Sequence, residues 1–136
     1  MANFYGQART NYFKVKDEDA FLEELGKYPV QIIKEEKDGE TLYGFLDDDS
    51  NGGGTIDYYV DERGEYLEVE WREFFMKHLA DDWVAVIMES GSEKYRYISG
   101  HATAFNNKGE AIHLDLSDIY ALATEKLGEK ITLAEY

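Results

Sequence analysis

The sequence predicts a single α+β domain over residues 1–136, with a largely antiparallel sheet and two or three helices packed on one face of it. Segments that alternate apolar and polar residues outnumber segments with helical spacing. Most of these segments are joined by turns too short for a parallel crossover. The composition, 43% hydrophobic and 15% aromatic, is also too apolar for an intrinsically disordered chain.

The elements expected in the first part of the chain are a strand at residues 9–16, a helix at 17–28, and strands at 30–33 and 41–46. The helix begins at Asp17, because acidic residues favour a helix N-terminus and apolar side chains then recur at helical spacing. It ends at Pro29. The next two strands flank Lys37-Asp38-Gly39, whose residue types favour a turn, so they form a hairpin.

Two short strands, at residues 55–60 and 65–70, are expected in the middle of the chain, on either side of a turn at Arg63-Gly64. Apolar residues then recur at helical spacing from Trp71 to Leu79, which predicts a short helix. The side chains expected to point outward from the two strands are Asp57, Tyr59 and Asp61 on the first, and Tyr66, Glu68 and Glu70 on the second.

The last part of the chain begins with residues 83–88, an almost wholly apolar run that predicts a central strand covered on both faces. Strands at 94–105 and 110–116 flank a turn at 106–109. Ser117 is a suitable N-cap for a final helix, which stops at Gly128. Its apolar stripe consists of Ile119, Leu122, Ala123 and Leu127.

The hairpin formed by these last two strands could assemble a metal site. With Lys108 at the centre of the turn, Thr103 opposes His113, and His101 opposes Asp115 on the same side of the sheet. Two histidines and a carboxylate can bind a metal or transfer protons, and the alternative is a polar outer face with an incidental His–Asp contact. The other side is apolar, so we expect helices to pack there and leave the histidine side wetter. Its residues are Ile98, Ala102, Ala104, Ile112 and Leu114.

The glycine-rich loop that begins at Asp47 matches the first half of a calcium-binding loop. Asp47, Asp49 and Asn51 supply oxygen atoms at alternate positions before a glycine. The second half of the pattern is absent, because no glutamate stands at its twelfth position and the flanking segments are predicted strands. An irregular Ca²⁺ site completed by Asp57 or Asp61 is the alternative to an ordinary acidic turn.

The negative charge of the chain is concentrated in one segment. The sequence has 29 Asp and Glu against 14 Lys and Arg, a formal net charge of −15. Residues 38–82 hold 14 of the acids and three of the bases, a net −11, which leaves −4 for the rest of the chain. Such a charge repels phosphate backbones and anionic lipid headgroups, so we expect no direct binding of nucleic acid or membrane surfaces.

Several classes of function are excluded or disfavoured by what the sequence lacks. There is no cysteine, and therefore no disulfide, thiol nucleophile or thiolate metal site. The phosphate-binding, dinucleotide-binding, zinc-protease, hydrolase and kinase signatures are also absent. We therefore expect a non-enzymatic protein without a cofactor. The sequence has no signal-peptide pattern and no apolar run of membrane-spanning length, which favours a cytoplasmic location.

The acidic segment suggests a surface that binds a basic protein, such as a nuclease or another nucleic-acid-binding enzyme. Alternate residues on a strand lie about 6.6 Å apart, comparable to successive phosphates of a nucleic acid, and tyrosines add contact area. The alternative is a surface that only maintains solubility. The candidate partner-binding residues are Asp47, Asp48, Asp49, Asp57, Tyr59, Asp61, Tyr66, Glu68 and Glu70. The oligomeric state is left open, including self-association through an aromatic surface.

Two stretches of the sequence resemble a group of known proteins. They are NFYGQARTNYFKVKDE at residues 3–18 and EKYRYISGHATAFNNKGE at residues 93–110. Both are similar to stretches of small acidic proteins carried by phages, plasmids and conjugative elements of bacteria, a group without assigned chemistry. The resemblance implies a counter-defence context, in which anti-restriction or anti-CRISPR proteins block the nucleic-acid-binding groove of an enzyme, by mimicry or by occupying it. It transfers no functional residue to this chain.

Overall fold

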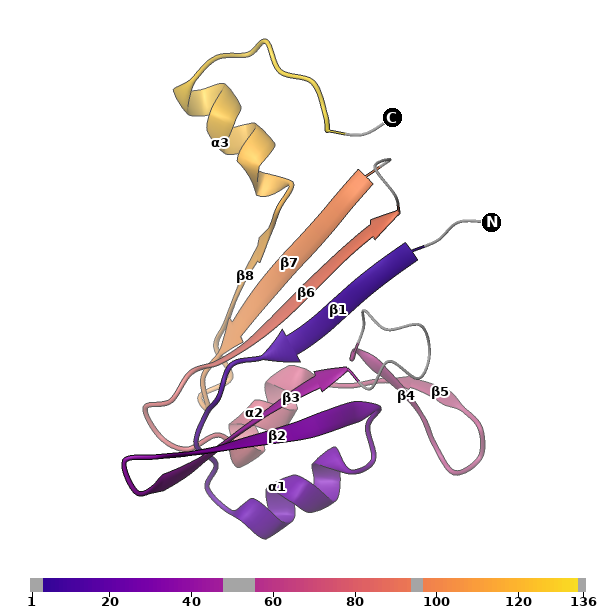
Figure 1. The fold of residues 1–136 in the computed structure, drawn as a ribbon, viewed down its shortest axis with the longest axis vertical. Coiled ribbons are helices and arrows are strands. Elements are labelled where there is room, and N and C mark those ends of the chain that lie inside the picture. The colour runs from indigo at the N-terminus through magenta and orange to yellow at the C-terminus, as the bar shows by residue number, and fades with distance from the viewer. Residues whose placement is uncertain (1–3, 48–55, 94–96, 135–136) are drawn as a thin grey trace.

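Six strands of the chain form one antiparallel sheet, two more form a separate small sheet, and three helices accompany them (Figure 1). The computed structural model describes residues 4–47, 56–93 and 97–134, and all of these elements lie there. The α+β fold class is confirmed. The elements are β1 (Phe4–Thr10), α1 (Glu18–Leu25), β2 (Val30–Lys37), β3 (Glu40–Asp47), β4 (Tyr58–Val60), β5 (Tyr66–Glu68), α2 (Trp71–His78), β6 (Ala85–Glu93), β7 (Tyr97–Phe105), β8 (Ala111–Asp115) and α3 (Asp118–Lys126).

The six-stranded sheet has the order β2-β3-β1-β6-β7-β8, so the first strand of the chain lies in its interior. β1 pairs antiparallel with β6 along its whole length, from Phe4 opposite Glu93 to Thr10 opposite Ile87. It also pairs antiparallel with β3. Figure 1 shows β2 and β3 strongly rotated relative to the other four strands, as expected of a twisted sheet.

The expected strand at residues 9–16 is wrong in its limits, because β1 ends at Thr10. The Asn11 side chain explains where the pairing stops. Its Oδ1 accepts a hydrogen bond from the Val86 N–H at 2.8 Å, and its Nδ2 donates to the Val84 carbonyl at 3.0 Å. A side chain thus takes hydrogen-bonding groups that a continued β1 would need, and the chain turns away from β6. Phe13 still pairs with Tyr43 of β3 through an isolated bridge.

The first helix and the first hairpin confirm their predictions closely. Asp17 caps α1, because its Oδ1 accepts a hydrogen bond from the Ala20 N–H at 3.2 Å. β2 and β3 pair from Val30 opposite Asp47 to the turn at Asp38 and Gly39. Both turn residues have positive φ, 51° and 79°, which is the conformation that a two-residue turn of type I′ requires.

β6 is an interior strand, as predicted, but it is not covered on both faces. Its odd-numbered residues Ala85, Ile87 and Glu89 are buried, whereas Met88 is 60% exposed. We call the side with the odd-numbered residues of β6, β7 and β8 the core face, and the side with their even-numbered residues the open face. The cross-strand register keeps this parity through all three strands.

The expectation that helices pack on the apolar side of the last hairpin is also wrong. That side is the open face, where Ile98, Ile112 and Leu114 are 67%, 74% and 57% exposed. α2 packs on the core face instead, with the Phe75 ring 5.1 Å from that of Phe105. The reason is the aromatic cluster on that side, which offers far more apolar contact than the aliphatic residues of the open face.

The centre of the core is an aromatic cluster that joins the sheet to α1 and α2. Phe13 is fully buried and meets Phe21, Phe45 and Phe75 edge-on, with ring centroids 5.9, 6.2 and 5.5 Å apart. Such edge-to-face pairs contribute beyond the area that they bury. Trp71, the first residue of α2, stacks on Phe45 at 4.9 Å. This packing fixes α2 and its Trp71, whose Nε1 donates a hydrogen bond to the Ile56 carbonyl in the segment just before β4.

Candidate metal centre

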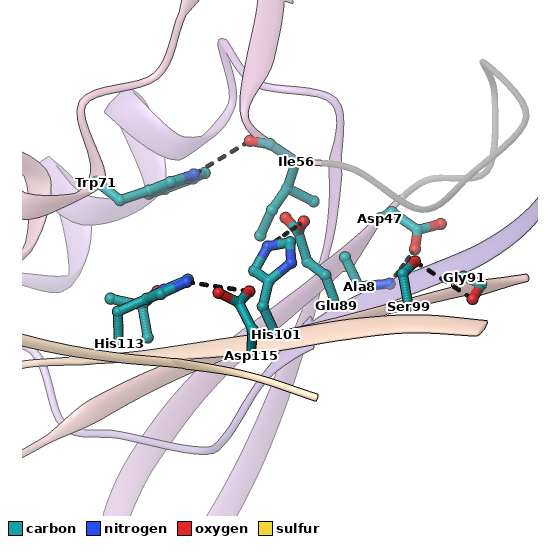
Figure 2. Close-up of polar contacts among 11 residues, drawn as sticks. Ala8, Asp47, Ile56, Trp71, Glu89, Gly91, Ser99, His101, His113 and Asp115 are labelled. Atoms are coloured by element: carbon teal, nitrogen blue, oxygen red, sulfur yellow. Dashed lines mark hydrogen bonds and ion pairs between the residues drawn. The ribbon is translucent and has the colours of Figure 1, made fainter. Parts of the chain in front are cut away.

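Glu89 is a buried carboxylate in the middle of β6. Alternation along the strand places it on the core face, after Ala85 and Ile87, and its side chain is 8% exposed. His101 of β7 lies directly opposite in the register. The His101 Nε2 and the Glu89 Oε2 are 2.8 Å apart, and Figure 2 shows the two side chains directed at each other.

Asp57 joins this pair from the segment just before β4. Its backbone is fixed on both sides: the preceding Ile56 is fully buried and its carbonyl accepts a hydrogen bond from the Trp71 Nε1 at 3.2 Å, while the Asp57 carbonyl accepts one from the Val69 N–H at 2.6 Å. One ligand atom each from Asp57, Glu89 and His101 lie within 4.8 Å of one another.

The electrostatics of Glu89 show that its negative charge is poorly accommodated. Burial, the charge and hydrogen bond of the neighbouring Asp57, and the charge of Asp47 together raise the pKa of its carboxyl group from the ordinary 4.5 to about 7, against a lowering by a hydrogen bond from the Ile56 backbone. Among the described residues, the Glu89 Oε1 has no hydrogen-bond partner. Since a second carboxylate adjoins it, the site favours either a shared proton or a bound cation.

The three side chains are suited to a divalent transition metal. One imidazole nitrogen and two carboxylates match the ligand preferences of Zn²⁺, Mn²⁺ or Fe²⁺, and the chain has no thiolate to favour a softer ion. Bonds of about 2.1 Å place two ligands of a tetrahedral site roughly 3.4 Å apart. Ligand atoms within 4.8 Å of one another therefore need only small side-chain rotations to converge.

The metal site expected from the last hairpin is assembled only in part. The register is the one predicted, with His101 opposite Asp115 and Thr103 opposite His113. However, both His113 nitrogens already have partners: Nδ1 is 2.8 Å from the Thr103 Oγ1, and Nε2 is 3.3 Å from the Asp115 Oδ1. The His101 and His113 rings lie 5.6 Å apart, but His101 contacts Glu89 instead of sharing a ligand set with His113 and Asp115 (Figure 2).

The six side chains expected to share one outward surface are divided between two faces of the β4–β5 hairpin. The register pairs Tyr59 with Leu67, and Val60 with Tyr66. Tyr59 therefore points inward, where its ring lies 5.0 Å from that of Tyr28. By the same alternation Asp57 and Asp61 lie on the Tyr59 side, whereas Tyr66, Glu68 and Glu70 lie outward, so the expected row is wrong for its first three members.

Two of the remaining acidic candidates, Asp47 and Asp61, accept hydrogen bonds from backbone N–H groups. The Asp47 Oδ2 accepts a hydrogen bond from the Ala8 N–H at 2.6 Å, which places its carboxylate beside β1. The Asp61 Oδ1 accepts hydrogen bonds from the Arg63 and Glu65 N–H groups, so this carboxylate closes the β4–β5 turn. Asp48 and Asp49, and with them most of the calcium-like loop from Asp47 to Asn51, lie outside the described residues.

Glu89 is the functional candidate that sequence reasoning missed. The sequence predicts a strand that ends at Met88, one residue earlier, so Glu89 lies just outside it. The available signal was the parity of the strand: continuing the core-facing positions Ala85 and Ile87 by two residues reaches Glu89. A carboxylate at a core-facing position is uncommon unless it is paired or binds a metal.

Comparisons with protein-family models, with curated proteins and with solved structures find no match for this chain. In the ranges that the structure describes, no helix is both long enough and apolar enough to cross a membrane.

Proposed function

We propose that this protein binds a divalent metal ion through Asp57, Glu89 and His101. The observation that carries the proposal is the buried Glu89 Oε1, which has no hydrogen-bond partner among the described residues and adjoins the Asp57 carboxylate. A divalent cation supplies the positive charge that two neighbouring carboxylates need when one of them is buried. The His113–Asp115 pair adjoins His101 and gives the site a polar surrounding.

The test is titration of the chelator-treated protein with Mn²⁺, Zn²⁺ and Ca²⁺, followed by calorimetry and thermal unfolding. A metal at 100 times its dissociation constant stabilises the folded state by about 2.7 kcal/mol. Glu89→Gln and His101→Gln should each remove most of this stabilisation. Because the chain carries many other carboxylates, Glu68→Gln and His113→Gln serve as controls that should retain it. No metal-dependent stabilisation, or an equal loss in the controls, would contradict the proposal.

A second candidate function is the binding of a basic, nucleic-acid-handling protein in the cytoplasm, as a counter-defence inhibitor would do. The observation that favours it is the outer face of the β4–β5 hairpin. There the Tyr58 and Tyr66 rings stack 5.4 Å apart while 44% and 66% exposed, and Glu68 lies opposite Tyr58. Exposed aromatic rings beside carboxylates suit an interface with a positively charged groove.

This second proposal is tested by inhibition of a panel of basic nucleases. Neutralising Glu62, Glu65 and Glu68 to glutamine should weaken inhibition and reduce its dependence on salt concentration. The matched control removes three exposed acids from other elements, as Asp19→Asn, Glu23→Gln and Glu35→Gln. The proposal would be contradicted if the wild type inhibited none of these nucleases, or if inhibition fell equally in both triple variants.

A further inference from the structure

The open face of β6, β7 and β8 is an apolar surface on which no helix or strand of the described residues packs, although the Leu116 side chain lies against Gly100 at one end of it. Met88 opposes Ala102, which in turn opposes Leu114, so the surface crosses all three strands. Met88 is 60% exposed, and Ile98 and Ile112 are 67% and 74% exposed. Contiguous apolar patches that stay exposed in this way commonly mark interaction sites.

α3 is a second element whose apolar residues are left exposed by the described residues. None of its residues, Asp118–Lys126, is buried, and Ile119 and Leu122 on its stripe are 58% and 48% exposed. The helix is tied to the sheet where it begins: the Leu116 N–H donates to the Gly100 carbonyl at 2.8 Å, beside the open face. Further along, the Tyr120 hydroxyl accepts a hydrogen bond from the Ala134 N–H of the segment that follows the helix. Figure 1 shows the body of α3 beyond the ends of β7 and β8 instead of over the sheet.

The exposed area agrees with a missing subunit. The chain has an accessible surface of 9604 Å², whereas a monomer of 15.7 kDa is expected to have about 7,300 Å². The excess is about 2,300 Å² per chain. A standard interface covers about 800 Å² per partner, and obligate homodimers cover roughly 2,000–5,000 Å² in total. The excess is larger than the share of one partner in a standard interface, so an interface of that size would bring the exposed surface closer to that of a monomer.

The distribution of charge indicates which face two copies can share. Each chain has a net charge of −15, so two copies repel one another wherever carboxylates meet. The described even-numbered residues of β6, β7 and β8, which form the open face, carry no charge. A basic partner finds no carboxylate there, whereas a second copy brings the apolar helix that this sheet lacks.

We propose that two copies of this chain form a symmetric dimer in which α3 of each copy packs on the open face of the other. A two-fold axis makes the exchange reciprocal, so that both open faces and both helices are covered at once. The candidate metal centre lies on the core face, on the opposite side of the sheet. Dimer formation and metal binding are therefore separable.

The test is the mass in solution, measured by sedimentation and light scattering from about 1 to 100 µM. The wild type should have twice the 15.7 kDa of one chain. Leu122→Asp places a charge on the α3 stripe and should raise the dimer dissociation constant about 30-fold or more. Ala121→Asp adds the same charge on the other side of the helix and should leave the dimer intact.

Ile112→Asp tests the open face independently of α3, and circular dichroism checks that each variant is folded. Leu122 and Ile112 are exposed within one chain, so the fold should tolerate both changes. A wild type of 15.7 kDa over the whole concentration range would overturn the proposal, and so would a dimer that both variants leave unchanged. Metal binding by the folded Leu122→Asp monomer should equal that of the wild type.

Discussion

Glu89→Gln should stabilise the metal-free protein at neutral and alkaline pH. The substitution keeps the size and shape of the side chain but removes a buried negative charge that has no hydrogen-bond donor for its Oε1 among the described residues. The glutamine amide can donate a hydrogen bond to Asp57, which a carboxylate cannot do. The variant therefore replaces repulsion between two acceptors with a donor–acceptor pair.

The magnitude follows from the pKa of Glu89, which is about 7 in the folded protein against an ordinary 4.5. Between these two pH values the folded state holds a proton that the unfolded chain has released, so wild-type stability falls as the pH rises. The full difference corresponds to about 3.4 kcal/mol, and relaxation of the site reduces it to about 2 kcal/mol. At pH 5 the effect should be roughly a quarter of its value at pH 8.

Urea unfolding at pH 5 and pH 8, followed by tryptophan fluorescence after chelator treatment, measures this difference. With a denaturant slope of about 2 kcal/mol per molar, the variant midpoint at pH 8 should lie roughly 1 M above that of the wild type. Glu68→Gln, an exposed acid on the outer side of β5, should show little difference at either pH. A Glu89→Gln effect that is equal at both pH values, or destabilising at pH 8, would refute the reasoning.

Three further predictions concern stability and are checked by the same unfolding assay. Burial tends to raise the pKa of Glu24, but hydrogen bonds from His78 and Lys77 outweigh this effect and lower the pKa. Glu24→Gln should therefore reduce the free energy of unfolding by about 1–2 kcal/mol at pH 7 and by less at pH 3. A reduction that does not depend on pH would contradict this prediction. Phe75→Ala should cost about 3–5 kcal/mol because the ring is fully buried, and a loss below 1 kcal/mol would mean that the core is packed differently. Gly44→Ala should cost about 1–3 kcal/mol, since the new Cβ would lie 2.8 Å from the Asn11 carbonyl oxygen; an unchanged midpoint would show that the two strands can separate there.

The parts of the fold that local chemistry determines were predictable from the sequence. The turns at Asp38-Gly39 and around Lys108 fix the registers of their hairpins, because their residue types allow few alternative backbone conformations. The turn around Lys108 thus predicts correctly that His101 lies opposite Asp115. The end of β1 was not predictable in this way, since it depends on hydrogen bonds between Asn11 and a strand more than seventy residues later.

The candidate site was only partly predictable because it depends on which face of each strand is buried. Tyrosines and carboxylates alternate on both faces of the β4–β5 hairpin, so its sequence does not distinguish inside from outside. Tyr59 points inward because Tyr28 lies there, and Asp57 is placed by the bond between Trp71 and Ile56. These contacts join distant segments, and periodicity within one strand contains no information about them.

The position of β1 in the interior of the sheet has a consequence for how the chain folds. Its pairing with β6 brings residue 4 opposite residue 93, so a long loop must close before this part of the ladder can form. During synthesis α1, β2 and β3 emerge early and β1 can pair with β3, whereas the pairing of β1 with β6 must wait until β6 has left the ribosome. The strand that is made first is thus among the last to be fully paired, and it joins the β2–β3 hairpin and the three strands β6, β7 and β8 into one sheet.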